Sequence, residues 1–124
     1  IALYEHTVVM FSFFTKEVLQ KVGGLPEEYD RCWEHVDHTY QIIKAGYHPP
    51  FWWFADLSNS YELIEEAPGA IENSSIAKDK QEWMERVMEG REIYKRKHGH
   101  YPNQPPQSSR EEVLTILKKL APHE

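Results

Sequence analysis

The sequence has 124 residues, 40% of them hydrophobic, and no apolar run long enough to span a membrane. This length allows one globular domain with a sizeable core. The net charge of −6 argues against nucleic-acid binding, because neutralising phosphates requires a basic surface. One cysteine excludes an internal disulfide and indicates a reducing, cytoplasmic compartment.

The first elements predicted are a strand and a short helix. Residues 8–14 are β-branched and aromatic, which indicates a largely buried strand. Thr15 is suited to cap a helix whose apolar residues follow one face, and Gly23 and Gly24 end that helix. We therefore expect a strand, a helix and a glycine stop in close succession.

Three further elements follow in the first half. Residues 31–45 carry apolar side chains at helical spacing, which predicts a second helix. The aromatic run 51–55 follows two prolines and predicts a strand. Asn59 and Glu62 have the spacing of a capping box, which predicts a short helix over about 59–66.

The second half is predicted to be mainly helical. Residues 75–98 form one long helical pattern, and the proline-containing segment 101–107 interrupts the regular structure. Ser109 and Glu112 form a second capping box at the start of an amphipathic last helix.

Together these elements predict an α/β chain of two short strands and four or five helices. We expect two parts, with residues 1–67 as the first and residues 68–124 as a C-terminal helical extension. The extension has more apolar side chains than one thin helical layer needs, which allows a homo-oligomer through these helices.

Four proton-active side chains stand at the start of the second helix: Glu34, His35, Asp37 and His38. On a helix Glu34, Asp37 and His38 share a face, whereas His35 points about 100° away from Glu34. The same pattern is also consistent with the solvated face of an amphipathic helix. The spacing of the two histidines suits zinc, but the sequence offers no identifiable third ligand.

A resemblance to a known family lies in the segment FSFFTKEVLQKVGGLPEEYDRCWEHVDHTYQIIKAGY. It resembles the C-terminal half of the catalytic domain of inverting, GT-A-fold glycosyltransferases of family 2. The matching pieces are, in order, Phe11 to Gly24, Leu25 to Tyr29, Glu34 to Asp37 and Ala45 to Tyr47. The resemblance implies a partial GT-A fold and transfer of a sugar from a nucleotide-sugar donor to a saccharide acceptor, in polysaccharide or glycan synthesis.

The resemblance also implies a catalytic role for the acidic segment. In the family a carboxylate on this helix removes the proton of the acceptor hydroxyl as it attacks the sugar. That base commonly occupies the second position of the acidic pair, where this sequence has His35. The catalytic candidates are therefore Glu34, His35 and Asp37.

Aromatic and basic residues complete the implied site. The acceptor-binding candidates are Trp33, His38, Trp52 and Trp53. A flat indole stacks on the C–H face of a sugar, but aromatic residues in a strand are more often core, so we expect one of Trp52 and Trp53 to be buried and the other to line the site. The candidates for binding the donor phosphates are Arg91, Lys95 and Lys97. These cations alternatively complement the dipole at the end of their own helix.

One part of the family pattern is missing. The family binds the nucleotide diphosphate and a divalent cation, Mn²⁺ or Mg²⁺, through a D-x-D motif, and this sequence contains none. We therefore expect an acceptor-side portion of a larger enzyme, inactive by itself, with most cation ligands outside this chain. Asp56 is the candidate ligand within it. The alternative is a non-catalytic carbohydrate-binding or subunit-interaction module that keeps the framework.

Overall fold

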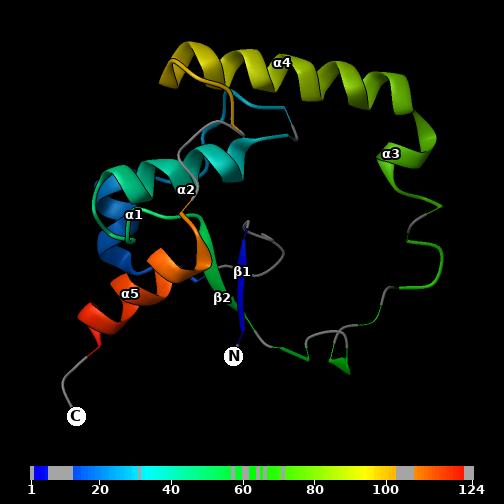
Figure 1. The fold of residues 1–124 in the computed structure, drawn as a ribbon. Coiled ribbons are helices and arrows are strands. Elements are labelled where there is room, and N and C mark those ends of the chain that lie inside the picture. Colours follow the sequence, from blue (N-terminus) through cyan, green and yellow to red (C-terminus); the bar gives the residue numbers. More distant parts are fainter. Residues whose placement is uncertain are drawn as a thin grey trace.

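The computed structural model describes residues 2–5, 13–30, 32–56, 58–59, 62–63, 65, 67–70, 72–102 and 108–121. Within these residues the regular structure is mostly helical, with two short strands. The elements are β1 (Ala2–Glu5), α1 (Lys16–Val22), α2 (Glu34–Lys44), β2 (Trp53–Asp56), α3 (Ser75–Lys78), α4 (Lys80–His98) and α5 (Arg110–Leu120) (Figure 1).

The two strands form an antiparallel pair. Ala2 lies opposite Asp56 and Glu5 lies opposite Trp53. The strand predicted over 51–55 is therefore confirmed, with a slightly later start. The strand predicted over 8–14 falls mostly outside the described residues, and the part that is described, Phe13 and Phe14, is not strand. The strand that pairs with β2 is β1, a segment for which no strand was predicted.

The first two predicted helices are present in the predicted order. In α1 the hydroxyl of Thr15 accepts a hydrogen bond from Val18 N at 3.3 Å, which confirms the predicted cap. The helix predicted over 31–45 is confirmed as α2, but it begins later. Trp33 has a φ of 75°, a left-handed conformation that a right-handed helix does not contain, so α2 starts after it.

The short helix predicted over about 59–66 is wrong for the residues that the structure describes. The carboxamide of Asn59 donates a hydrogen bond to the carboxylate of Glu62 at 3.0 Å. The backbone N–H of Glu62 donates to the backbone carbonyl of Asn59 at 3.0 Å, and not to the Asn59 side chain as a capping box requires. The described part of this segment contains turns and one residue of 3₁₀ geometry, Glu62.

The second half is helical, as predicted, but its long helix is divided. Asp79 is extended, with φ −145°, and its side chain accepts a hydrogen bond from Glu82 N at 2.8 Å. It therefore caps α4 and separates it from α3. In α5 both hydrogen bonds of the capping box between Ser109 and Glu112 are present, which confirms that prediction.

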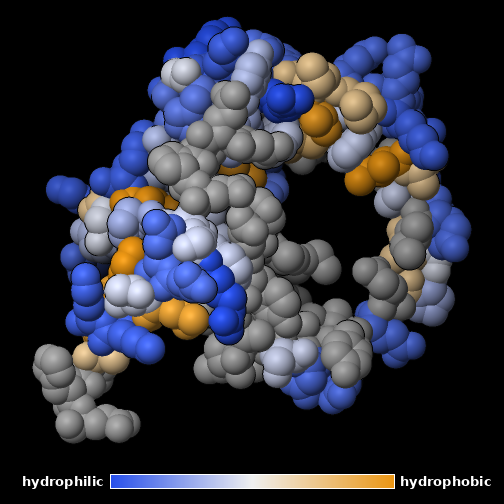
Figure 2. Space-filling model, viewed as in Figure 1, coloured by the Kyte–Doolittle hydropathy of each residue, from blue (hydrophilic) through white to orange (hydrophobic). Residues whose placement is uncertain are grey.

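Figure 1 shows that the C-terminal part of α4 lies over α2, while its N-terminal part reaches away to α3. We call residues 75–85 the arm and residues 86–98 the anchor. Figure 2 shows the arm standing off from the rest of the molecule across an open space. The buried residues of α4, Gly90 and Tyr94, both belong to the anchor.

The core combines both halves of the chain. Its buried apolar side chains are Val18, Tyr29, Cys32, Ile42, Phe51, Trp52, Tyr94 and Val113. The rings of Tyr40 and Tyr94 are 6.0 Å apart, and Trp53 Nε1 donates to Ser108 O at 3.1 Å. Contacts of this kind cross the boundary predicted between residues 67 and 68. Among the described helices, none is long and apolar enough to cross a membrane.

Candidate functional site

The acidic segment of α2 divides into an enclosed pair and a partly exposed pair. Asp37 is 0% exposed and His38 is 2% exposed. The side chains of Glu34 and His35 keep 28% and 35% of their surface accessible. The face of α2 that carries Asp37, His38 and Ile42 therefore points into the molecule.

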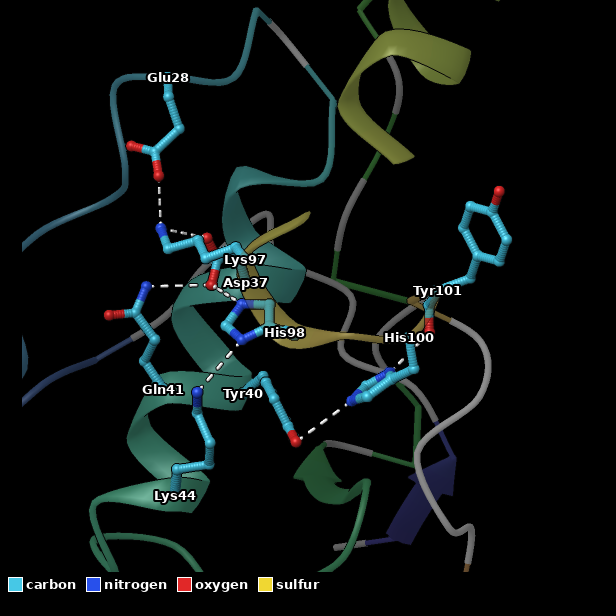
Figure 3. A network of polar contacts seen from close by, with 9 residues as sticks. All are labelled: Glu28, Asp37, Tyr40, Gln41, Lys44, Lys97, His98, His100 and Tyr101. Atoms are coloured by element: carbon cyan, nitrogen blue, oxygen red, sulfur yellow. Dashed lines mark hydrogen bonds and ion pairs between the residues drawn. The ribbon is translucent and has the colours of Figure 1, made fainter. Parts of the chain in front are cut away.

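Asp37 lies at the centre of a polar network that joins α2 to the end of α4 (Figure 3). Its Oδ1 accepts a hydrogen bond from Gln41 Nε2 at 3.0 Å and lies 2.6 Å from His98 Nε2. Its Oδ2 forms an ion pair with Lys97 Nζ at 2.7 Å. Lys97 also contacts Glu28 at 2.5 Å, so the network reaches the loop that precedes α2.

The network keeps its acids ionised. Burial alone would raise the pKa of Asp37, but hydrogen bonds from Lys97, His98 and Gln41 outweigh it and hold that pKa below its ordinary value. Burial would lower the pKa of Lys97, but Asp37 and Glu28 raise it above its ordinary value. The hydrogen bond from Lys97 likewise lowers the pKa of Glu28. Asp37 and Lys97 therefore form an ion pair near neutral pH.

His38 connects α2 to the end of α1. Its Nε2 lies 2.9 Å from the carbonyl oxygen of Gly23, and because a carbonyl only accepts, Nε2 carries the proton and donates it. The ring of Phe14 meets the His38 ring edge-on at 5.0 Å. The structure thus gives this predicted acceptor-binding residue two partners within the protein.

Glu34 and His35 form the more accessible pair. Glu34 Oε1 lies 3.6 Å from His35 Nδ1, so the two side chains approach each other although their backbone positions diverge. The other carboxylate oxygen, Oε2, is enclosed and has no hydrogen-bond partner among the residues that the structure describes. An acid with an unpaired oxygen beside an imidazole is suited to accept a proton.

The three tryptophans near the site are held by other elements. Trp33 Nε1 donates to Val87 O at 2.9 Å, which fixes the ring against α4. Trp52 is buried, and its ring is stacked on Tyr40 at 6.2 Å. Trp53 is half-buried and donates to the backbone before α5. Of the two neighbours in the strand region, Trp52 is therefore the buried one.

The predicted phosphate-binding cations do not converge on one point. Lys97 turns toward Glu28 and Asp37. Arg91 and Lys95 lie over the ring of Tyr101, at 5.0 Å and 4.5 Å from its centre. These contacts place Arg91 and Lys95 apart from the ion pair of Lys97.

Asp56, the predicted cation ligand, is the last residue of β2, and its side chain lies outside the described part. No group of three or more His, Cys, Asp or Glu side chains that could hold a metal occurs in the described part of the chain.

Two residues that bind Asp37, Gln41 and His98, were not among the predicted site residues. Gln41 binds Asp37 one turn along α2, and His98 binds it from the end of α4. The spacing of Asp37 and Gln41 is a signal that could have found the first. Nothing local to α2 indicates the second, because His98 is far away in the sequence.

No protein-family model matches the sequence, and no curated protein or solved structure matches it. The resemblance to glycosyltransferases therefore depends on the residues of the sequence itself.

Proposed function

We propose that this chain is the acceptor-side part of an inverting, nucleotide-sugar-dependent glycosyltransferase of GT-A type. The observation that carries the proposal is the division of the acidic segment. Asp37 is enclosed and bound by cationic and amide groups, whereas the side chain of Glu34 is partly exposed beside His35 and its Oε2 has no hydrogen-bond partner among the described residues. The segment that resembles the family's catalytic helix thus contains one acid that is available for chemistry.

In the proposed reaction Glu34 is the general base. Its carboxylate accepts the proton of the acceptor hydroxyl while the hydroxyl oxygen forms a bond to the anomeric carbon and the nucleotide diphosphate leaves. His35, at 3.6 Å from Glu34, stabilises the carboxylate when its own ring is protonated. Asp37 takes no part in the proton transfer. Its contacts with Lys97 and His98 hold α2, which carries Glu34, against α4.

The family's divalent cation has no evident place among these residues. Mn²⁺ or Mg²⁺ takes several oxygen ligands, and the described residues form no such cluster. The proposal for the described residues covers proton transfer and acceptor positioning, and the cation expected from the family would take most of its ligands from outside this chain.

The test is glycosyl transfer by the protein that carries this chain, measured with a panel of nucleotide sugars and Mn²⁺. We expect Glu34→Gln to lower the rate by ~10²-fold or more, because the amide cannot accept the proton. Asp37→Asn is the matched comparison. It should lower stability together with activity, whereas Glu34→Gln should leave stability unchanged. Wild-type transfer by Glu34→Gln would exclude Glu34 as the base.

A second candidate is a non-catalytic carbohydrate-binding or subunit-interaction module. The observation that favours it is that Asp37 and His38, half of the acidic segment, make contacts only within the described protein. Met84 and Met88, each about half exposed on α4, would be available to a second subunit. Glycan binding without transfer or donor hydrolysis in the same assay would support this candidate over the enzyme.

A further inference from the structure

His98, the last residue of α4, is enclosed between α4 and α2 (Figure 3). Its side chain is 1% exposed. Its Nε2 lies 2.6 Å from Asp37 Oδ1, and its Nδ1 lies 3.1 Å from Lys44 Nζ. Both ring nitrogens are therefore occupied by residues of α2, one in its first turn and one in its last.

These two contacts determine the protonation state of the ring. The ammonium group of Lys44 can only donate, so Nδ1 of His98 must offer its lone pair. The one proton of the neutral imidazole then sits on Nε2, which donates it to the carboxylate of Asp37. Both contacts are satisfied together only by the neutral ring with its proton on Nε2.

The surroundings of His98 oppose a second proton. The titratable and charged groups that face it are Asp37, Tyr40 and Lys44 from α2, Tyr94 and Lys97 from α4, and His100 beyond α4. The carboxylate of Asp37 would favour a positive ring, but it already pairs with Lys97. Burial is the main reason that the pKa of His98 lies below its ordinary value of 6.5, and both lysines lower it further.

We propose that His98, Asp37 and Lys44 form a pH-sensitive latch that joins α4 to α2 while the imidazole is neutral. Protonation at Nδ1 would place an N–H against the ammonium of Lys44, where the lone pair had been. Lys44 is then displaced, and the end of α4 loosens from α2. The inference depends on these contacts alone, and it holds whether or not the protein transfers sugars.

His100 provides a matched comparison two residues away. Its Nδ1 lies 2.9 Å from the carbonyl oxygen of Tyr101, so Nδ1 carries the proton. Its Nε2 lies 3.2 Å from the hydroxyl of Tyr40. A hydroxyl donates or accepts, so a second proton on His100 keeps both contacts. Protonation therefore breaks a contact at His98 and none at His100.

The direction of the pH dependence follows from the lowered pKa of His98. Such a group stabilises the closed state above its ordinary pKa of 6.5, and this contribution is lost as the pH falls below that value. In the open state the anchor has loosened from α2. The ratio of open to closed molecules then rises by up to about tenfold between pH 7.5 and pH 5.5. One histidine whose pKa is 6.5 in the open state can change this ratio by no more than that factor over this pH range.

The test uses the protein that carries this chain and two measurements. Nitrogen-detected NMR of the imidazoles should find His98 neutral with its proton on Nε2 at pH 7.5. Amide hydrogen exchange, corrected for intrinsic rates, should show protection in the anchor falling several-fold by pH 5.5. His98→Gln keeps a donor for Asp37 without titrating, so it should remove that fall. His100→Gln, the control, should retain it.

Two results overturn the proposal. One is a His98 ring with its proton on Nδ1 at pH 7.5, and the other is a pH response in His98→Gln equal to that of the wild type. If His98→Gln does not fold, Lys44→Gln replaces it, with Lys21→Gln at the end of α1 as the control. Removing the Lys44 ammonium should move the His98 titration to higher pH, and an unchanged midpoint also overturns the latch.

Discussion

The N-terminal part of α4 belongs to the arm and its C-terminal part is the anchor, yet the two parts contact the rest of the molecule differently. The anchor contributes the buried Tyr94, the close approach at Gly90 and the ion pair of Lys97. The arm contributes Met84, which is 49% exposed, and a capping residue, Asp79. Helix propensity alone does not distinguish them, so the difference arises from tertiary contacts.

The largest expected effect is at Tyr94, which is fully buried against Tyr40 and His98. Tyr94→Ala removes a large ring from the core and should lower the free energy of unfolding by about 3–5 kcal/mol. Met84→Ala in the arm is the matched control and should cost about 0.5 kcal/mol or less. Urea unfolding of both variants measures the comparison. Equal losses would show that the arm is packed as firmly as the anchor.

The next effect is at Gly90, where a side chain would meet Trp33. A Cβ at this position would lie 2.7 Å from Trp33 Cδ1 and 3.0 Å from Cys32 O. Gly90→Ala should therefore lower the free energy of unfolding by about 1 kcal/mol net, because overpacking of about 1–3 kcal/mol exceeds the gain in helix propensity.

The neighbour Trp33 supplies the control for Gly90. In a Trp33→Ala background the clash with the ring is absent, so Gly90→Ala should lower the free energy of unfolding by less than it does in the wild type, with the contact to Cys32 O remaining. A double-mutant cycle thus isolates the contact. An unchanged cost of Gly90→Ala in that background would mean that the ring is not what restricts this position.

The smallest global effect is expected at Asp79, which caps α4 at the arm end. Asp79→Ala should weaken the first turn of α4 by about 1 kcal/mol locally, with less than this in the global free energy of unfolding. Because the arm has few buried contacts, amide exchange should rise in residues 80–85 and stay unchanged in the anchor. Ser109→Ala, at the start of α5, is the corresponding control. Equal loss of protection in arm and anchor would contradict the conclusion that the two parts of α4 differ in their tertiary contacts.

Several features of the fold were predictable because their causes are local. Thr15 and Ser109 cap their helices through hydrogen bonds to residues three positions away, and both predictions are confirmed. The same reasoning gives a wrong prediction at Asn59. Its spacing to Glu62 is equally good, but the backbone N–H of Glu62 donates to the backbone carbonyl of Asn59 and not to its side chain.

The candidate site was predictable only in part. The sequence places Glu34, Asp37 and His38 on one face of a helix, because helical geometry fixes their relative directions. It does not say that Asp37 would bind Lys97 and His98, about sixty residues later. Which acid remains accessible is decided by those partners. This is why Glu34, Asp37 and His35 stand as equal candidates in the sequence and as unequal ones in the structure.

The sequence by itself determined the first two helices and the last one, the caps of α1 and α5 and the helix that carries the acidic segment. These depend on side chains within about one turn of each other. The tertiary structure decided the left-handed turn at Trp33, the pairing of β1 with β2 and the enclosure of Asp37 and His98. Each of these needs a partner distant in the sequence, and local periodicity carries no information about which distant groups will meet.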